Sequence, residues 1–326
     1  MVGWAAAQWK ETQILVRDYG LTTKQAYFLA MGGVVVQNTS GNIRPITIND
    51  LYRDSRNNHD AGLVAFIRQH SDADINDRSK SDGVSKCVVT IQLVWFIIQC
   101  VARAIEGLAI TELEVSTVAI AVPGVVASLL WFSKPLAVTI PILFTGNWSF
   151  EFPGNTQRQE DESKWAKSLN SILVLDSSLD DLIEMGCVSD FYVVTAPEDG
   201  VELLPYGVAC LTGVVFGAIH CLAWNFTFIT VAEKQLWRTA SVIVASLPAF
   251  IPASTLLLAA AAAFLIPTGF WNKMLLSLAK KVVEISGFLY CAARLTLLAL
   301  VFAELRDLSP GIYKAIQWVR LIPHIN

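Results

Sequence analysis

Residues 87–106 read CVVTIQLVWFIIQCVARAIE, and residues 113–133 read LEVSTVAIAVPGVVASLLWFS. Each stretch has about 20 mostly apolar residues, the length that an α-helix needs to cross a hydrocarbon core of about 30 Å. In lipid, an open strand would leave its backbone groups without hydrogen bonds, so both stretches must be helices. They predict a helical hairpin through a bilayer, with a turn near residues 107–111.

Three further stretches have the same character, and they lie at residues 206–230, 240–266 and 282–303. The sequence therefore predicts an all-α fold, a polytopic integral membrane bundle of about five transmembrane helices. Two shorter apolar runs, 26–36 and 136–144, are too short to span and suit interfacial or re-entrant segments. Tryptophans near the predicted span ends suit an aromatic belt at the membrane surface, and they are Trp95, Trp131, Trp224, Trp237 and Trp271.

The composition agrees with a membrane protein. Of 326 residues, 54% are hydrophobic and 16% are charged, against about 25% charged in an average soluble domain. The mean hydropathy is +0.49. A net charge of -4 gives no reason to expect nucleic acid as a partner. The six cysteines form no C-x-x-C pair, so we expect no metal and no cofactor, and the bilayer is the expected partner.

The hydropathy pattern divides the chain into five segments. Residues 1–86 form an N-terminal interfacial or soluble segment, and residues 87–133 form the transmembrane hairpin. Residues 134–205 form an extramembrane loop, and its part 145–204 holds 12 acidic and three basic residues. Residues 206–303 hold three transmembrane helices, and residues 304–326 form an amphipathic tail. With five spans, the loop and the N-terminal segment lie on the same side of the membrane.

Several tracts resemble a large family of uncharacterised multi-span integral membrane proteins that are abundant in fungi. The tracts are INDRSKSDGVSK (75–86), WFIIQCVAR (95–103), ITELE (110–114), WFSKPLAV (131–138), FGAIHCLAWNF (216–226), EKQLWRTAS (233–241) and LRDLSPGIYKAIQWVRLIPHI (305–325). The matching family patterns are D-K-S-K-x-D, W-F-x-x-Q-C-x-A-R, T-x-L-E, W-W-x-K-P-L, F-G-x-I-H-C-x-A-W, L-W-R-x-S-S and F-I-P-H-I. The resemblance implies no settled activity. Members usually carry another hydrophobic segment before the tract that matches GWAAAQW (3–9), so we expect that the chain lacks an N-terminal span.

Ionisable residues inside the spans are the candidates for function, because each costs a few kcal/mol to insert. They are Arg103, Glu106, His220, Glu284 and Arg294, and Glu112 and Glu114 lie at a span entrance. Arg103 and Glu106 are neighbours on one helix face and can form an ion pair at the interface. Alternatively, Glu106, Glu112 and Glu114 surround a site mouth with one carboxyl as general acid, or they line a cation path. His220 is either a hydrogen-bonded packing residue or a proton-transfer group. We predict that Arg103, Glu106, His220 and Arg294 converge inside the bundle.

Other patterns have simpler interpretations. Asp180, Asp181 and Glu184 spell the metal-binding D-D-x-x-E of prenyl-diphosphate enzymes, but the capping signature that starts at Ser178 explains them better. The run DADIND (72–77) lacks the glycine and glutamate of a calcium loop and suits the start of a solvated helix. Pro248 and Pro252 predict a kink in the fourth span, or a gating hinge or substrate cavity.

Three classes of function stay open. The first is a membrane-embedded enzyme acting on a lipid-soluble substrate, for example acid-catalysed terpene or meroterpenoid cyclisation, which would make it an isomerase. Its catalytic candidates are Glu106, Glu112, Glu114 and His220, and its substrate-binding candidates are Arg103, Trp95, Trp224 and Arg294. The second is an ion channel or transporter, for which oligomers are possible. The third is a structural or signalling protein. The expected location is an endomembrane or the plasma membrane.

Overall fold

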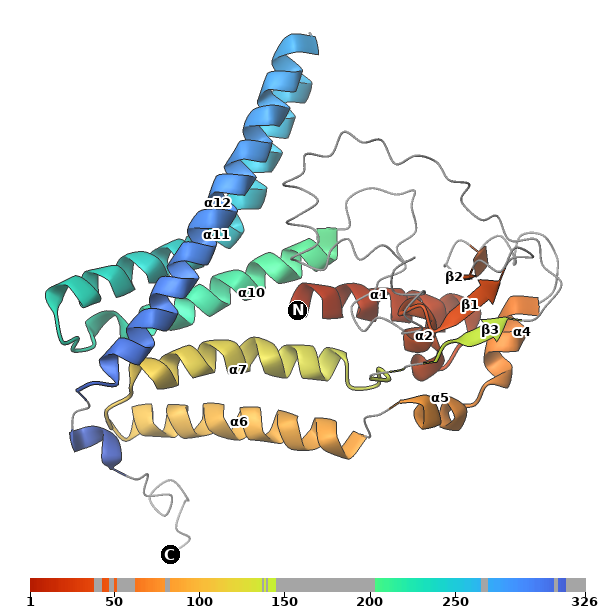
Figure 1. Ribbon diagram of the computed structural model, residues 1–326, viewed down its shortest axis with the longest axis horizontal. Helices are drawn as coiled ribbons and strands as arrows, with labels where there is room; N and C mark the ends of the chain where they lie inside the picture. The colour runs from red at the N-terminus through yellow and green to blue at the C-terminus, as the bar shows by residue number, and fades with distance from the viewer. Residues whose placement is uncertain are drawn as a thin grey trace, which may run out of the picture. The chain divides into compact units, whose positions relative to one another are not determined.

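The computed structural model describes residues 1–37, 43–46, 50–51, 62–79, 83–136, 138, 140–144, 203–264, 269–307 and 310–314 (Figure 1). These residues form two compact units. Unit 1 consists of residues 1–3, 88–129 and 203–326, and unit 2 of residues 4–87 and 130–202. Within the described residues, five helices are long and apolar enough to cross a membrane. The prediction of an all-α membrane protein with five spanning helices is confirmed.

The first two spans form the predicted hairpin. Helix α6 runs over Gly83–Ile105 and α7 over Glu112–Leu130. The turn between them contains Gly107, whose φ of 66° is a left-handed conformation that glycine adopts without strain. The two helices meet at Gly124, where an added Cβ would lie 3.2 Å from a methyl carbon of Leu93. Helix α7 continues through Pro123, a proline for which we predicted no role.

The other three spans follow one another along the chain. Helix α10 (Leu203–Cys221) leads through the short 3-10 turn η1 (Leu222–Asn225) to α11 (Val231–Phe264), and α12 (Gly269–Glu304) follows. Helix α11 packs against both α10 and α12. Pro248 and Pro252 lie inside α11, which continues past both.

Small residues bring α10 and α11 together. A Cβ at Gly217 would lie 2.3 Å from the backbone of Ala245, and a Cβ at Gly213 would lie 2.7 Å from the ring of Pro248. Gly213 and Gly217 are four residues apart, the spacing that lets helices approach closely in membranes. The two contacts also show that the helices are antiparallel, because the later residue on α10 meets the earlier residue on α11.

The core of unit 1 lies among α7, α10, α11 and α12. Its buried members are small or aliphatic, apart from two aromatic residues, Phe216 and Trp237, of which Trp237 is fully buried. We predicted Trp237 in the interfacial belt, and this prediction is wrong. Its indole Nε1 donates a hydrogen bond of 3.1 Å to the carbonyl oxygen of His220, which satisfies its only polar group inside the protein.

Unit 2 is a small folded body of helices on a short sheet. Its helices are α1 (Val2–Tyr19), α2 (Thr23–Ala30), α4 (Gly62–Gln69) and α5 (Asp72–Arg78). Its strands are β1 (Val34–Gln37), β2 (Ile43–Pro45) and β3 (Ile142–Phe144), in the order β2-β1-β3. Strand β2 is antiparallel to β1, and β3 is parallel to it. The sequence did not predict this sheet.

The two short apolar runs that we expected at the interface supply the core of unit 2. Residues of α2 and β1 from the first run, and of β3 from the second, are buried in one cluster. Strand pairing aligns Val34 with Ile142 and Val36 with Phe144. Since strands pair only within one compartment, this pairing requires both segments on the same side of the membrane, as the five-span count predicts.

Polar contacts in unit 2 join two of the sequence tracts that carry the family resemblance. The hydroxyl of Ser79 donates to the carbonyl of Leu136 at 3.0 Å and accepts from its N–H at 3.1 Å. The ammonium of Lys86 donates to the carbonyl oxygens of Trp131, Phe132 and Lys134 just after α7 ends. A cation is favourable there because helix carbonyls at the C-terminus carry partial negative charge.

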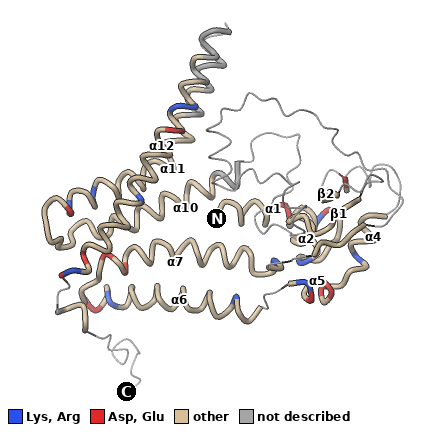
Figure 2. Tube along the Cα trace, viewed as in Figure 1, with Lys and Arg blue, Asp and Glu red and all other residues tan. Residues whose placement is uncertain are grey.

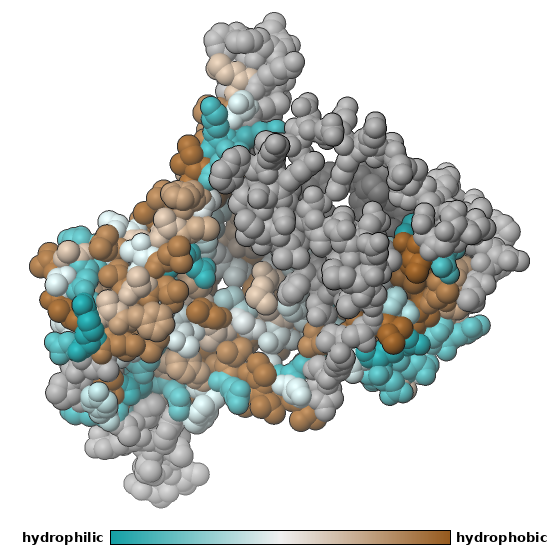
Figure 3. Space-filling model, in the orientation of Figure 1, coloured by the Kyte–Doolittle hydropathy of each residue, from teal (hydrophilic) through white to brown (hydrophobic). Residues whose placement is uncertain are grey.

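The surface of the spans suits lipid. Large apolar side chains are exposed along α6 and α12, among them Ile91 (67%), Phe288 (78%) and Leu295 (66%). Figure 3 shows hydrophobic side chains covering much of the visible, described surface of the helices. Figure 2 shows that α10 is free of Lys, Arg, Asp and Glu, and that α7 carries charge only in its first turn. The protein is therefore a multi-span membrane protein with the bilayer as its environment.

Candidate functional site

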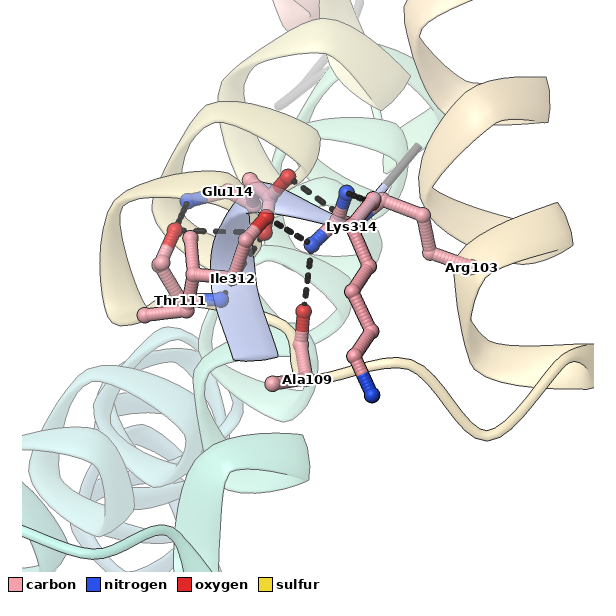
Figure 4. A network of polar contacts seen from close by, with 6 residues as sticks. All are labelled: Arg103, Ala109, Thr111, Glu114, Ile312 and Lys314. Carbon is pink, nitrogen blue, oxygen red and sulfur yellow. Dashed lines mark hydrogen bonds and ion pairs between the residues drawn. The ribbon is translucent and has the colours of Figure 1, made fainter. Parts of the chain in front are cut away.

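Arg103, near the end of α6, is the centre of a polar network that lies wholly in unit 1 (Figure 4). Its guanidinium donates to the carbonyl oxygens of Ala109 (2.6 Å), Ile312 (3.0 Å) and Lys314 (3.2 Å). Its Nε lies 3.3 Å from a carboxylate oxygen of Glu114, and the Arg103 side chain is only 12% exposed. One side chain thus ties α6 to the hairpin turn, to α7 and to the C-terminal segment that contains η2 (Pro310–Tyr313).

Glu114 has a second task, which is to cap α7. Its other carboxylate oxygen accepts from the backbone N–H of Thr111 at 2.8 Å, and the Thr111 hydroxyl accepts from the N–H of Glu114 at 3.1 Å. This is a capping box, in which Thr and Glu three residues apart satisfy each other's orphan donors. Because Arg103 and Thr111 occupy both of its oxygens, we assign Glu114 to structure.

Two buried carboxyl groups lie at the same end of unit 1. Glu112 is 8% exposed and Glu304, the last residue of α12, is 5% exposed. Their negative charges interact, and Oε1 of Glu304 has no hydrogen-bond partner in the described part of the chain. Nearby, Glu233 forms a 2.7 Å ion pair with Arg306. These acids do not form a set that could hold a metal ion, as far as the described residues go.

His220 lies in an aromatic cluster between α10 and α11. It is 3% exposed, and its Nδ1 lies 2.8 Å from the carbonyl oxygen of Phe216, one turn earlier on α10. Its ring centroid lies 4.6 Å from that of Phe216 and 5.9 Å from that of Trp237. The ring centroid of Phe228 lies 5.7 Å from that of Trp237, which adds Phe228 to the cluster.

Ser241 lies at the level of His220. The contacts of Gly213 with Pro248 and of Gly217 with Ala245 set the antiparallel register, which places residue 241 of α11 opposite residue 220 of α10. Ser241 is fully buried, and its hydroxyl has no hydrogen-bond partner in the described part of the chain. A buried polar group without a partner is costly in a membrane protein and is a reason to look for function there.

Arg294 of α12 contacts this cluster through Phe216. Its guanidinium carbon lies 3.9 Å from the ring centroid of Phe216, a cation–π distance, and its Nη1 donates to the Tyr290 hydroxyl at 3.2 Å. Phe216 therefore has His220 against its ring and Arg294 over it. The residue is exposed, although it lies well inside the last span.

The predicted site residues thus fall into two networks. Arg103 and Glu114 belong to one, and His220 and Arg294 belong to the other. Within the described residues, no hydrogen bond or ion pair joins the two networks. Glu106 immediately follows α6, and its backbone N–H bonds to Ala102.

The two tryptophans proposed to bind substrate are both exposed, Trp95 at 49% and Trp224 at 39%. The guanidinium of Arg238 lies 4.9 Å from the Trp224 ring and donates to its carbonyl oxygen. Such a pair of amphipathic side chains is typical of the membrane surface, so Trp224 suits the predicted belt.

Sequence reasoning missed four residues of the His220 cluster: Phe216, Ser241, Trp237 and Tyr290. The spacing could have found two of them, because Phe216 precedes His220 and Tyr290 precedes Arg294 by four residues, which puts each pair on one helix face. Glu304 was missed because it lies beside charged residues in the sequence and looks solvated. The D-D-x-x-E segment, its capping signature at Ser178 and the acidic loop lie outside the described residues.

The run DADIND starts helix α5, as predicted. Ser71 is its N-cap, and its hydroxyl and N–H both bond to the carboxylate of Asp74, at 2.9 and 2.8 Å. These hydrogen bonds, the one from the backbone N–H first, hold the pKa of Asp74 below its usual range. Asp74 is thus used in capping.

A comparison with known protein families found one match, to a family that has no assigned activity. Residues 6–152 match a family of unknown function, DUF8562. The matched range covers the described parts of unit 2 and the α6–α7 hairpin, and it ends before the His220 cluster. No curated protein and no solved structure gave a significant match.

Proposed function

We propose that the protein is a membrane-embedded enzyme that acts on a lipid-soluble substrate, with His220 as its proton-transfer group. The observation that supports this most is the buried cluster of His220, Phe216, Trp237 and Ser241 inside the spans. Polar groups at membrane depth are expensive, and they are usually kept for function.

The hydrogen bond of His220 favours one protonation pattern. A carbonyl oxygen only accepts, so Nδ1, which faces the Phe216 carbonyl, carries the proton. In a neutral ring, Nε2 is then the acceptor and can serve as a general base. Ser241, at the same level with an unpartnered hydroxyl, is a second group that a substrate could contact.

The surroundings of His220 favour proton transfer by this histidine over acid-catalysed cyclisation by a carboxylic acid. Such cyclisation needs a carboxylic acid beside the aromatic cluster, whereas Glu112, Glu114 and Glu304 lie at the ends of their helices. The resemblance to fungal membrane proteins supports a location in an endomembrane or the plasma membrane, which is part of the proposal.

A structural role is the alternative that a specific observation favours. The hydrogen bonds of Arg103 and its ion pair with Glu114 hold helices and the C-terminal segment together, so this half of the predicted site is structural. A purely structural protein would not need the buried polar side chains of His220 and Ser241 inside its spans. We therefore prefer an enzymatic role to a structural one.

The test compares the lipids of host membranes that contain the wild-type chain, His220→Gln or Thr212→Val. Thr212 lies on the same helix, and its hydroxyl donates to the carbonyl oxygen of Val208, one turn earlier, at 2.7 Å, so this variant is the matched control. We expect mass spectrometry to find a lipid product with the wild type and with Thr212→Val. Its level should fall about 100-fold with His220→Gln, the usual scale of lost acid–base catalysis. If His220→Gln gives the same lipids as the wild type, or the wild type the same as an empty vector, the proposal is wrong.

A further inference from the structure

Arg294 has no charged partner in the described part of the chain. Its contacts are the hydroxyl and ring of Tyr290 and the ring of Phe216, all of them neutral. It is also exposed on the surface of unit 1. In water an exposed arginine needs no explanation, but Arg294 belongs to a helix that spans the membrane.

The depth of Arg294 follows from the helix geometry. It lies ten residues before Glu304, which is about 15 Å along α12 at 1.5 Å per residue. The contact of Arg294 with the ring of Phe216, the residue before Gly217, and the contact of Gly217 with Ala245 place Arg294 about level with Ala245 of α11. About 15 Å is half the thickness of a hydrocarbon core, so Arg294 lies near its middle.

No carboxylate of the five spans lies at this depth. Glu112 and Glu114 begin α7, Glu233 is in the first turn of α11 and Glu304 ends α12. Glu284 lies ten residues away in the other direction, again about 15 Å. Copies of the chain cross a membrane in the same direction, so the spans of a second copy would present the same depths and could not neutralise Arg294.

We propose that Arg294 binds the carboxylate of a membrane-dissolved amphiphile of the fatty-acid type, with Tyr290 and Phe216 positioning its guanidinium. The inference rests on the proposed function and names its substrate class. A guanidinium matches a carboxylate with two parallel hydrogen bonds. The exposed apolar side chains of Leu295 and Leu298 lie beside it on α12 and suit an alkyl chain.

The charge balance selects a carboxylate over a phosphate monoester. Arg294 is the single charged residue at this level in the described parts of α10, α11 and α12, and the next on α11 is Arg238. One carboxylate neutralises one arginine, whereas a phosphate monoester carries about −1.5 to −2 charges at neutral pH. The phosphate would leave excess negative charge in the hydrocarbon core.

The test measures binding of three probes to the full chain in detergent micelles by native mass spectrometry. The probes are oleate, oleyl phosphate and oleyl alcohol, which share one alkyl chain and differ in the head group. We expect oleate to bind most tightly, and Arg294→Gln to weaken it about tenfold or more, as for a lost hydrogen bond to a charged group. Lys281→Gln removes another exposed cation of α12 and should leave oleate binding unchanged.

Tyr290→Phe is a second variant for the case that Arg294→Gln does not fold, because it removes only one hydroxyl group. It should weaken oleate binding less than Arg294→Gln does. Equal binding of oleate and oleyl alcohol by the wild type, or tighter binding of oleyl phosphate, would overturn the inference. Unchanged oleate binding by Arg294→Gln would also overturn it. These results would leave the His220-dependent lipid product untouched, so failure of the inference is distinguishable from failure of the proposed function.

Discussion

At the scale of single residues, the charged and polar side chains of this protein have two kinds of surroundings. Arg103, Glu114 and Lys86 each take part in several hydrogen bonds at helix ends or turns, and Asp74 accepts two from Ser71. Arg294 by contrast has one hydrogen bond in the described part of the chain, to the Tyr290 hydroxyl, and otherwise meets aromatic rings. The number of hydrogen-bond partners, more than the residue type, separates a structural polar group from a candidate functional one.

The capping box of α5 gives a pH-dependent prediction. Two hydrogen bonds from Ser71 hold the pKa of Asp74 down, so the folded state has the lower pKa. The stabilising effect is therefore present above the ordinary aspartate pKa and is lost as the pH falls through the folded value. We expect Ser71→Ala to raise the pKa of Asp74 toward its usual value, because the hydroxyl hydrogen bond is lost. NMR titration of the carboxyl carbon measures it, and an unchanged pKa would contradict the assigned cause.

At the scale of elements, close helix contact explains why two glycines of the third and fifth spans differ. A Cβ on Gly217 of α10 would lie 2.3 Å from the backbone of Ala245, but a Cβ on Gly287 of α12 would meet nothing within 4 Å. Within the described residues, the same residue type therefore serves packing in one helix and meets no neighbour in the other.

We expect Gly217→Ala to destabilise unit 1 by about 2 kcal/mol, since overpacking costs about 1–3 kcal/mol and backbone atoms cannot give way easily. Gly287→Ala should be neutral or stabilise by up to about 1 kcal/mol, because alanine is the better helix former. Thermal unfolding of both variants in the same detergent gives the comparison. If Gly217→Ala proves as stable as Gly287→Ala, α10 and α11 do not pack at this glycine.

The Arg103 network predicts how the C-terminal segment is held. Arg103→Gln should leave Glu114 without its cation, and the carbonyls of Ile312 and Lys314 without their donors. Loss of one partner from a largely buried pair costs about 3 kcal/mol. We expect faster trypsin cleavage after Lys314 in Arg103→Gln than in Arg238→Gln, which removes an arginine that donates to the carbonyl oxygen of Trp224. Equal cleavage rates would mean that Arg103 does not secure this segment.

At the scale of the whole molecule, the sequence predicts the spans well and unit 2 poorly. Hydropathy located α6 and α7 to within a few residues, because lipid demands long uninterrupted apolar runs. The pairing of β1 with β3 joins residues about 100 positions apart, and no local pattern encodes such a contact. The same holds for the site: the sequence marked His220 and Arg294 as costly residues, but their meeting at Phe216 depends on the helix register.

The path of the chain through the membrane yields the last prediction. Five crossings put unit 2 and the end of α11 that leads into α12 on one side, and the residues after η1 and after α12 on the other. Single cysteines at Asp77 and Met274 report on the first side, and cysteines at Ile229 and Asp307 on the second; all four positions are exposed. In a chain whose native cysteines are replaced by serine, a membrane-impermeant maleimide should label the first pair from one face of sealed vesicles and the second pair only from the other.

The β1–β3 pairing supports this placement of unit 2, since a strand cannot pair across a bilayer. Labelling of Asp77 and Asp307 from the same face would require an even number of crossings, and one of the five helices would then have to lie outside the membrane.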